Sequence, residues 1–302
     1  MIVYKNLNIK KIHKNSVIAI GNFDGFHLGH QKVLKEAKKR AKKNNMKCGL
    51  ISFEPMPMMF FNSKIKRHRV NSIYQKKFYL EKLGIDFLVL IAFNKIFSNL
   101  SAEKFIKKII CNKLNSRYVY VSKNFRFGKK RLGNIKTLKN HEDNFFYKTI
   151  ITKPYKKKQK IISSSLIRKY ISSGNIEKAN RLLGRSWSII GKVFKGEQRG
   201  RKIGFPTCNI NLQEYITPKL GVYSVTVETK SFKRRGIANI GYRPTFNGSK
   251  LLLEVNIFGI DLNLYKKTIK VNFLKFIRAE KKFKGIAQLK KQIKKDIYIA
   301  KK

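Results

Sequence analysis

The sequence has few acidic residues, few cysteines and no long hydrophobic run. Asp and Glu together number 16 in 302 residues, against 69 Lys and Arg, so the formal net charge is +53. The three cysteines are widely spaced and fit neither a disulfide framework nor the paired cysteines of a zinc site. No apolar stretch approaches the roughly 18 residues that a membrane-spanning helix needs. We therefore expect a protein of the reducing cytoplasm with no membrane partner.

The N-terminal segment also lacks the features of a secretion signal. Residues 1–14 alternate Lys with Ile and Val and contain neither an apolar core nor a small-residue cleavage site. The 42% hydrophobic content is too high for an intrinsically disordered chain, and it supplies enough apolar side chains for one large or two ordinary domains. We expect a folded protein that is not exported.

The excess of basic residues allows two interpretations. A positive charge of this size favours binding to a polyanion such as nucleic acid. However, the basic residues are 54 Lys and 15 Arg spread over the whole chain, whereas nucleic-acid binders concentrate Arg, whose planar fork binds phosphate and base edges. We favour A+T-rich coding as the origin and expect no specific nucleic-acid partner. Nonspecific binding at low salt follows from either interpretation.

Buried strands and helices alternate in the first part of the chain. The apolar runs predict strands at residues 16–20, 48–53, 87–93 and 118–122. Between them, helical spacing of apolar residues predicts helices at 31–43, 74–83 and 102–111. This alternation predicts a Rossmann-like α/β domain, whose parallel sheet is covered on both faces and binds its ligand at the carboxyl ends of the strands.

The pattern changes after residue 152. Two helices are expected at 163–171 and 176–183. From Trp187 onward, short alternating runs separated by Gly and Pro predict an antiparallel β-barrel or sandwich, and an amphipathic helix at 286–299 closes it. The simplest division is an N-terminal α/β domain, 1–181, and a C-terminal β domain, 182–302.

A glycine- and histidine-rich motif, GNFDGFHLGH, spans residues 21–30 between the first strand and the first helix. Triphosphates bind at this position of an α/β fold, because glycines let the backbone approach and the helix N-terminus offers unpaired N–H groups. His27 and His30 can point at one phosphate group and stabilise the charge that develops there. On these residues alone, histidines that only cap the helix remain an alternative.

A second glycine-rich motif, GEQRGRKIGFPTCN, spans residues 196–209. Thr207 and Asn209 are two residues apart in an extended segment, so both can offer oxygen to one hard cation, and Cys208 should point the other way. Mg²⁺ fits this donor set, because it bridges ATP phosphates while a glycine loop supplies backbone donors to them. A turn that precedes a strand remains an alternative.

Over nearly its whole length the chain resembles the bacterial bifunctional riboflavin kinase/FMN adenylyltransferase (FAD synthetase) family. The resemblance implies phosphorylation of riboflavin to FMN by ATP in domain 182–302. It implies adenylylation of FMN by ATP to FAD, with release of pyrophosphate, in domain 1–181. The motifs that carry it are residues 21–30, 53–55, 125–128, 163–168, 182–185, 200–209, 221–223, 241–246, 253–255 and 278–283.

For the adenylyltransferase, the resemblance implies that His27 and His30 bind and polarise the ATP phosphates. Further ATP contacts are expected from Gly21, Phe23, Asp24, Gly25, Gly29, Ser164, Ser165 and Arg168. The flavin is expected to contact Pro55, Pro57, Phe60, Asn124 and Phe127.

For the kinase, the resemblance implies that Glu254 accepts the proton of the ribityl hydroxyl as the γ-phosphoryl group arrives. Thr207 and Asn209 would hold Mg²⁺. ATP is expected to contact Gly196, Gly200, Arg201, Gly204 and Pro206. The flavin is expected to contact Tyr223, Arg278 and Glu280.

Three departures from the family pattern leave one alternative open. Met56 stands where the family usually has His, Asn124 where it has Asp, and Leu166 where it has Arg. A chain with these changes could retain the kinase and have lost the adenylyltransferase. The net charge leaves a second alternative, a basic nucleic-acid-binding protein on an enzyme scaffold.

Overall fold

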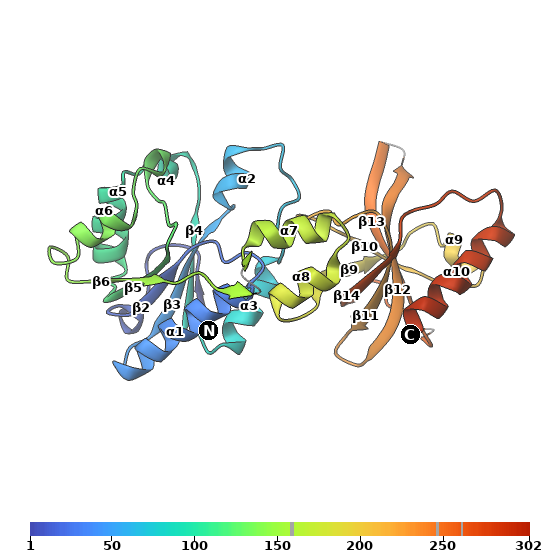
Figure 1. Ribbon diagram of the computed structural model, residues 1–302, viewed down its shortest axis with the longest axis horizontal. Coiled ribbons are helices and arrows are strands. Elements are labelled where there is room, and N and C mark those ends of the chain that lie inside the picture. The colour runs from blue at the N-terminus through green and yellow to red at the C-terminus, as the bar shows by residue number, and fades with distance from the viewer. Residues whose placement is uncertain (158–159, 246–247, 261) are drawn as a thin grey trace. The chain divides into compact units, whose positions relative to one another are not determined.

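The computed structural model describes residues 1–157, 160–245, 248–260 and 262–302, in two compact units (Figure 1). The first unit comprises residues 1–66 and 73–163, and the second comprises 67–72 and 164–302. The short segment 67–72 belongs to the second unit because its backbone binds there. The Trp187 indole N–H donates a hydrogen bond to the Val70 carbonyl at 2.9 Å.

The first unit contains a six-stranded sheet in the order β1-β4-β3-β2-β5-β6, with every neighbouring pair parallel. Its strands are β1 (Ile2–Tyr4), β2 (Val17–Ile20), β3 (Cys48–Glu54), β4 (Phe87–Ala92), β5 (Tyr118–Ser122) and β6 (Lys148–Thr152). The predicted parallel sheet is confirmed. The two edge strands, β1 and β6, were not predicted.

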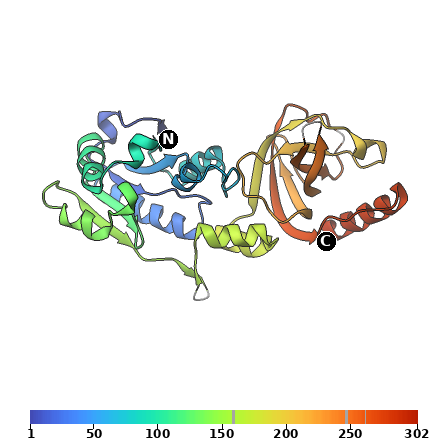
Figure 2. The same ribbon diagram turned by 90° about the horizontal axis from the view of Figure 1, so that it is seen from above.

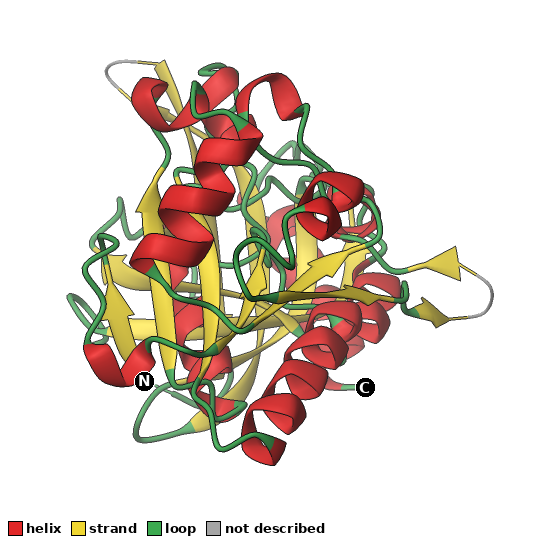
Figure 3. Ribbon diagram, turned by 90° about the vertical axis from the view of Figure 1, so that its left-hand side faces the viewer, coloured by secondary structure: helices red, strands yellow, loops and turns green. Residues whose placement is uncertain are grey.

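Helices cover both faces of this sheet (Figures 1 and 3). Alternate residues of each strand point to opposite faces, so Val17 and Ala19 pack in one core and Ile18 and Ile20 in the other. Helices α1 (Leu28–Lys43) and α3 (Ile73–Lys82) contribute to the first core, and the π-helix η2 (Ile106–Lys113) and α6 (Ile135–Asn140) to the second. The remaining elements of this unit are η1 (Lys11–His13), α2 (Pro57–Phe61), α4 (Lys95–Ser98), α5 (Ala102–Phe105), η3 (Lys129–Arg131) and the pair β7 (Lys156–Lys157) and β8 (Lys160–Ile161).

The second unit contains a closed six-stranded barrel in the order β10-β13-β12-β11-β14-β9. Antiparallel pairing of β9 with β10 closes it, which decides between the barrel and the sandwich left open by the sequence. The barrel strands are β9 (Trp187–Phe194), β10 (Cys208–Asn211), β11 (Gly221–Glu228), β12 (Lys233–Thr245), β13 (Gly248–Ile257) and β14 (Thr268–Arg278). Its helices are α7 (Ser164–Ser172), α8 (Ile176–Leu183), α9 (Arg199–Lys202) and α10 (Ile286–Lys301).

Large aromatic side chains fill the barrel. Helix α10 lies beside the barrel (Figure 2). Trp187, Tyr223 and Phe273 are almost completely buried, and the rings of Trp187 and Phe273 have centroids 4.7 Å apart. The apolar side of α10 packs against residues of β11 and β12, as the predicted closing helix requires.

Helix α8 joins the barrel rather than the parallel sheet. The Asn180 side chain donates to the Phe273 carbonyl at 2.9 Å and accepts from the Trp187 backbone N–H at 2.7 Å. The compact units therefore divide between residues 163 and 164, and the boundary between the two activities at 181 and 182 stays a prediction.

Candidate active sites

The parallel sheet brings three of the predicted motifs to one edge. β3, β2 and β5 are neighbours in the sheet, and the chain leaves their carboxyl ends at Glu54, Ile20 and Ser122. The Gly21–His30 motif follows β2, the Pro55–Phe60 segment follows β3, and Asn124 follows β5. Because parallel strands end at a common edge, these motifs meet where an open α/β sheet binds its ligands.

The two histidines of the first motif form a stack at the N-terminus of α1. His27 is the N-cap, and its Nδ1 accepts a hydrogen bond from the His30 backbone N–H at 3.2 Å. The imidazole centroids are 3.6 Å apart with an angle of 18° between the rings. A Cβ at Gly29 would lie 3.1 Å from the His27 ring, so glycine leaves room for this stack. His27 therefore caps the helix, and both imidazoles lie where helix N–H groups attract anions.

A buried lysine is linked by hydrogen bonds to the Gly21–His30 motif. The Lys76 ammonium donates to the Ser52 hydroxyl at 2.9 Å, and that hydroxyl donates to the Asn22 carbonyl at 3.3 Å. Only 3% of Lys76 is exposed. This residue could not be predicted from the sequence, because one lysine among many on a predicted helix is typical of the solvated surface.

The predicted flavin contacts of the first unit lie on two segments. Pro57 and Phe60 lie on α2, where the Phe60 ring contacts Phe93 with centroids 5.3 Å apart. Pro55 and Asn124 are exposed. Phe127 is 7% exposed and packs in the core, so its contact with a flavin stays a prediction.

The departures from the family pattern occupy different environments. Met56 is 2% exposed and packs as an apolar side chain, whereas Asn124 is exposed. Leu166 lies on α7 of the second unit, together with the predicted ATP ligands Ser164, Ser165 and Arg168. The Arg168 Nε–H donates to the His68 carbonyl at 2.9 Å. The contact of α7 with ATP bound at His27 and His30 stays a prediction.

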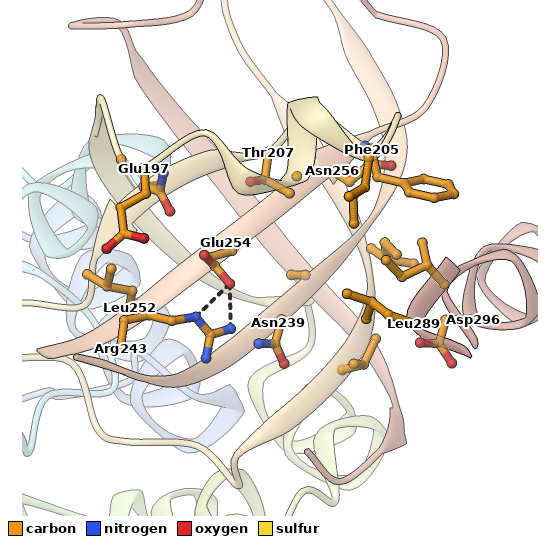
Figure 4. Close-up of a pocket in the computed structure, with 18 of the residues that line it drawn as sticks. Glu197, Phe205, Thr207, Asn239, Arg243, Leu252, Glu254, Asn256, Leu289 and Asp296 are labelled. Carbon is orange, nitrogen blue, oxygen red and sulfur yellow. Dashed lines mark hydrogen bonds and ion pairs between the residues drawn. The ribbon is translucent and has the colours of Figure 1, made fainter. Parts of the chain in front are cut away.

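The barrel carries a cavity of about 830 Å³ on its outer surface (Figure 4). The loop after β9, strands β10, β12 and β13, the end of β14 and helix α10 line it. The predicted kinase residues that line it are Gly196, Gly200, Thr207, Asn209, Glu254, Arg278 and Glu280. Arg201, Pro206 and Cys208 line a smaller neighbouring hollow of about 40 Å³, and Gly204 turns the chain with φ = 88°.

Tyr223 lies on the other face of β11. It shares that face with Val225 and Val227, while Val222 lines the cavity. Its ring packs on Phe273, its hydroxyl donates to the Lys219 carbonyl, and burial raises its pKa. The structure thus places Tyr223 apart from the other predicted flavin contacts of the kinase, and its role stays a prediction.

Strand register places the predicted base beside the predicted metal ligands. Asn209 of β10 is directly opposite Glu254 of β13, so their side chains share one face of the barrel. Thr207 lines the same cavity (Figure 4). A Cβ at Gly196 would overlap the Asn209 amide, so glycine is needed for the close approach of the loop. The set of oxygen donors fits a hard cation such as Mg²⁺.

Arg243 pairs with two carboxylates in the cavity. Its Nε and Nη2 both donate to Oε2 of Glu254, and the distance from Nε to that oxygen is 3.1 Å. Its Nη1 donates to Oε1 of Glu280 at 3.3 Å. Burial alone would lower the pKa of Arg243, but the hydrogen bonds and charges of Glu254 and Glu280 raise it above its usual value. Arg243 lies in the 241–246 motif, and no role was predicted for it from the sequence.

The cavity is balanced in charge, unlike the chain as a whole. Among the described side chains that line it, four are carboxylates and four are cations, namely Glu197, Glu254, Glu280 and Asp296 and Lys202, Arg243, Arg278 and Lys281. Its apolar lining includes Phe205, Phe283, Leu289 and Ile293. The cavity is therefore built for a partly apolar ligand and is not an extension of the basic surface.

Asp296, which the sequence analysis missed, holds α10 against the barrel. It is 1% exposed and accepts from Arg278 Nη2 at 2.7 Å and from Gln292 at 2.8 Å. A signal existed, because Asp296 is the one acidic residue in a helix rich in lysine.

We expect Asp296→Ala to loosen α10. Breaking a buried ion pair by removing one partner costs roughly 3–5 kcal/mol, because the other charge is left uncompensated. Hydrogen exchange of the α10 amides should become faster, and the KM for the cavity's substrate should rise. Unchanged protection of α10 would contradict this role, and Asp143→Ala, at an exposed carboxylate of the first unit, is the control.

Across the residues that the structure describes, no helix is long and apolar enough to cross a membrane. The described part of the chain also has no cluster of three or more His, Cys, Asp or Glu side chains arranged to hold a metal.

Comparisons with known proteins cover the whole chain. Residues 9–166 match the family model described as FAD synthetase, and residues 183–302 match that described as riboflavin kinase. Two relatives named bifunctional riboflavin kinase/FMN adenylyltransferase come from Buchnera aphidicola subsp. Schizaphis graminum and Bacillus subtilis. The first relative is 47% identical over 98% of this chain and 96% of its own length. The second is 38% identical over 95% of this chain and 92% of its own length.

A crystal structure described as a macrolide-efflux protein from Streptococcus pneumoniae is also similar. It is 31% identical, with a TM-score of 0.87 over 99% of this chain and 98% of that one.

The first unit is an α/β domain that matches FAD synthetase, and the second is a β-barrel that matches riboflavin kinase. Together they define a two-domain transferase that uses ATP. The chain belongs to the family of bifunctional riboflavin kinase/FMN adenylyltransferases. It carries both enzyme domains, and the substrates of its two activities are riboflavin, FMN and ATP, with FAD as the final product. These matches favour the bifunctional enzyme over both alternatives, the chain with a kinase alone and the nucleic-acid-binding protein.

Proposed function

We propose that the two activities of this family are divided between residues 182–302 and 1–181. Residues 182–302 would transfer the γ-phosphoryl group of ATP to the ribityl 5′-hydroxyl of riboflavin, which yields FMN and ADP. Residues 1–181 would transfer AMP from ATP to the FMN phosphate, which yields FAD and pyrophosphate. The observation that supports this division best is the cavity of the barrel, which joins Glu254, Thr207 and Asn209.

In the kinase, Glu254 would act as the base and accept the hydroxyl proton while the γ-phosphoryl group is transferred. Thr207 and Asn209 would hold Mg²⁺, which neutralises the charge of the ATP phosphates when bound. The loop from Gly196 to Phe205 would contact the phosphates through its backbone, and the apolar side chains of α10 would contact the flavin.

In the adenylyltransferase, His27 and His30 would stabilise the charge that develops on the α-phosphorus and on the leaving pyrophosphate. The N–H groups at the start of α1 would add to this effect. Such a reaction needs no covalent intermediate, because the FMN phosphate attacks directly.

Incubation of the purified protein with riboflavin, ATP and Mg²⁺ tests the proposal. We expect chromatography of the flavins to show FMN first and FAD later, and neither to form in excess EDTA. FMN that accumulates without FAD would favour the kinase-only alternative. No product from a folded protein would contradict the proposed function.

We also propose a cytoplasmic location and no specific nucleic-acid partner. All three cysteines are free thiols, which supports a reducing compartment. Any binding to nucleic acid should weaken steeply as salt increases, because it would depend on the net charge of +53.

A further inference from the structure

Arg243 binds one carboxylate oxygen of Glu254, and the other oxygen is left to face the cavity (Figure 4). Both of its donors to Glu254, Nε and Nη2, bind Oε2. Within the described ranges of the chain, Oε1 of Glu254 has no hydrogen-bond partner. The two donors come from one rigid guanidinium, so they hold Oε2 in place better than a single ammonium on a flexible stem does.

A second carboxylate holds Arg243 in turn. Oε1 of Glu280 accepts from Nη1 of Arg243 and from the Asn239 amide, both at 3.3 Å. Gly241 makes this possible, because a Cβ there would overlap the Glu280 carboxylate and lie 2.9 Å from Arg243 Nη1. Gly241 and Arg243 are two residues apart on β12, so they face the same side.

We propose that Arg243 is a positioning residue for phosphoryl transfer and that it directs Oε1 of Glu254 toward the substrate hydroxyl. Glu280 holds Arg243 in place, and Gly241 leaves the space that the Glu280 carboxylate needs. In the step, the hydroxyl oxygen forms a bond to the γ-phosphorus and the bond from that phosphorus to ADP breaks. The hydroxyl proton passes to Oε1 of Glu254. This inference rests on the proposed role of Glu254 as the base.

The orientation of Glu254 matters because proton transfer needs close and aligned atoms. A misplacement of about 1 Å can cost on the order of 10²-fold in rate. Without Arg243, the Glu254 carboxylate could rotate between orientations, and only some of them would direct an oxygen to the hydroxyl. The loss should therefore appear in kcat rather than in the KM for ATP.

A double-mutant cycle tests whether Arg243 acts through Glu254. We expect Arg243→Met to lower the kcat of FMN formation by about 10²-fold. The double variant Arg243→Met/Glu254→Gln should be no slower than Glu254→Gln alone, because both changes remove the same step. Losses that multiply in the double variant would show that Arg243 acts independently, for example on the phosphate, and would overturn the proposal.

The failure of this inference is distinguishable from failure of the proposed function. If Glu254→Gln retains full kcat, then Glu254 is not the base, and the roles of both Glu254 and Arg243 are overturned, while the formation of FMN still supports the kinase. If Glu254→Gln is slow but Arg243→Met is fully active, then the base remains and the positioning role is overturned.

Two further variants test how Arg243 is held. Glu280→Gln keeps the shape of the side chain but removes its charge, and we expect a loss in kcat of about 3- to 10-fold, less than that of Arg243→Met. Gly241→Ala displaces the same carboxylate and should cause a similar loss. Arg243→Lys should recover only part of the activity, because an ammonium group on a flexible stem lacks the rigid pair of donors that holds Oε2. Full activity in Gly241→Ala and Glu280→Gln would overturn the role of Glu280.

Controls separate these effects from misfolding. Arg234→Met changes an exposed arginine of the same strand outside the cavity and should retain the parent activity. Trp187 is the single tryptophan and is buried in the barrel, so its fluorescence reports whether the second unit is folded. FAD formation from supplied FMN provides a second check in the same preparation.

Discussion

Replacement of Glu254 with Gln lowers the rate of FMN formation by about 10²- to 10⁴-fold, the usual contribution of general base catalysis. Gln has nearly the same volume, and its amide oxygen can still accept from Arg243, so the cavity should keep its shape. The amide cannot take up the proton of the ribityl hydroxyl. The measurement is the initial rate of FMN formation from riboflavin at saturating ATP and Mg²⁺.

A carboxylate at the far end of the barrel provides the control for this result. Glu228 lies on β11, pairs with Lys270 at 2.8 Å and does not line the cavity. Burial alone would raise the pKa of Glu228, but the hydrogen bonds and charges of Lys270 and Lys233 lower it below its usual value. Glu228→Gln therefore also removes a negative charge. We expect that variant to form FMN at the parent rate. Equal activity of both variants would remove Glu254 from the reaction.

Replacement of His30 with Ala lowers FAD formation from FMN by about 10²- to 10³-fold, as expected when one group that stabilises transition-state charge is lost. FMN formation from riboflavin should continue, so FMN accumulates in a reaction supplied with riboflavin and ATP. The measurement is the ratio of FAD to FMN over time. A normal ratio would contradict the role of His30.

His27 needs a different substitution, because it also caps α1. His27→Ala would remove the acceptor for the His30 N–H together with the imidazole, and loss of an N-cap costs about 0.5–2 kcal/mol. His27→Asn supplies an oxygen that can cap the helix, so it removes the imidazole alone. We expect a loss of FAD formation similar to that of His30→Ala. His141→Asn, near the end of α6, is the matched control.

Most of the fold follows from periodicity in the sequence. The four inner strands of the sheet were predictable, because each is a short apolar run buried on both faces. β1 was missed because it has only three residues, and β6 was missed because Lys148, Thr149 and Thr152 interrupt its apolar run. Closure of the barrel depends on pairing between β9 and β10, and a period of two does not specify which strands pair.

The sites were predicted to different degrees. The spacing of the motifs predicted the glycines and histidines of the first unit and the Thr207–Asn209 pair. It could not show that Tyr223 faces away from the cavity, although Val222 and Tyr223 must lie on opposite faces of a strand. Arg243 and Asp296 were missed because their partners are distant in sequence and are set by strand register and helix packing.

The assignment of residues 67–72 to the second unit determines how the two enzymes can be separated. The chain passes between the units after residues 66, 72 and 163, so one cut cannot divide them. A fragment that begins at residue 182 would lose the Val70 carbonyl that accepts from Trp187 and the Arg69 partner of Glu214. It would also lose most of α8. We therefore expect a truncation that begins at residue 182 to destabilise the barrel, because residues 67–72, which belong to the same compact unit, lie far earlier in the sequence.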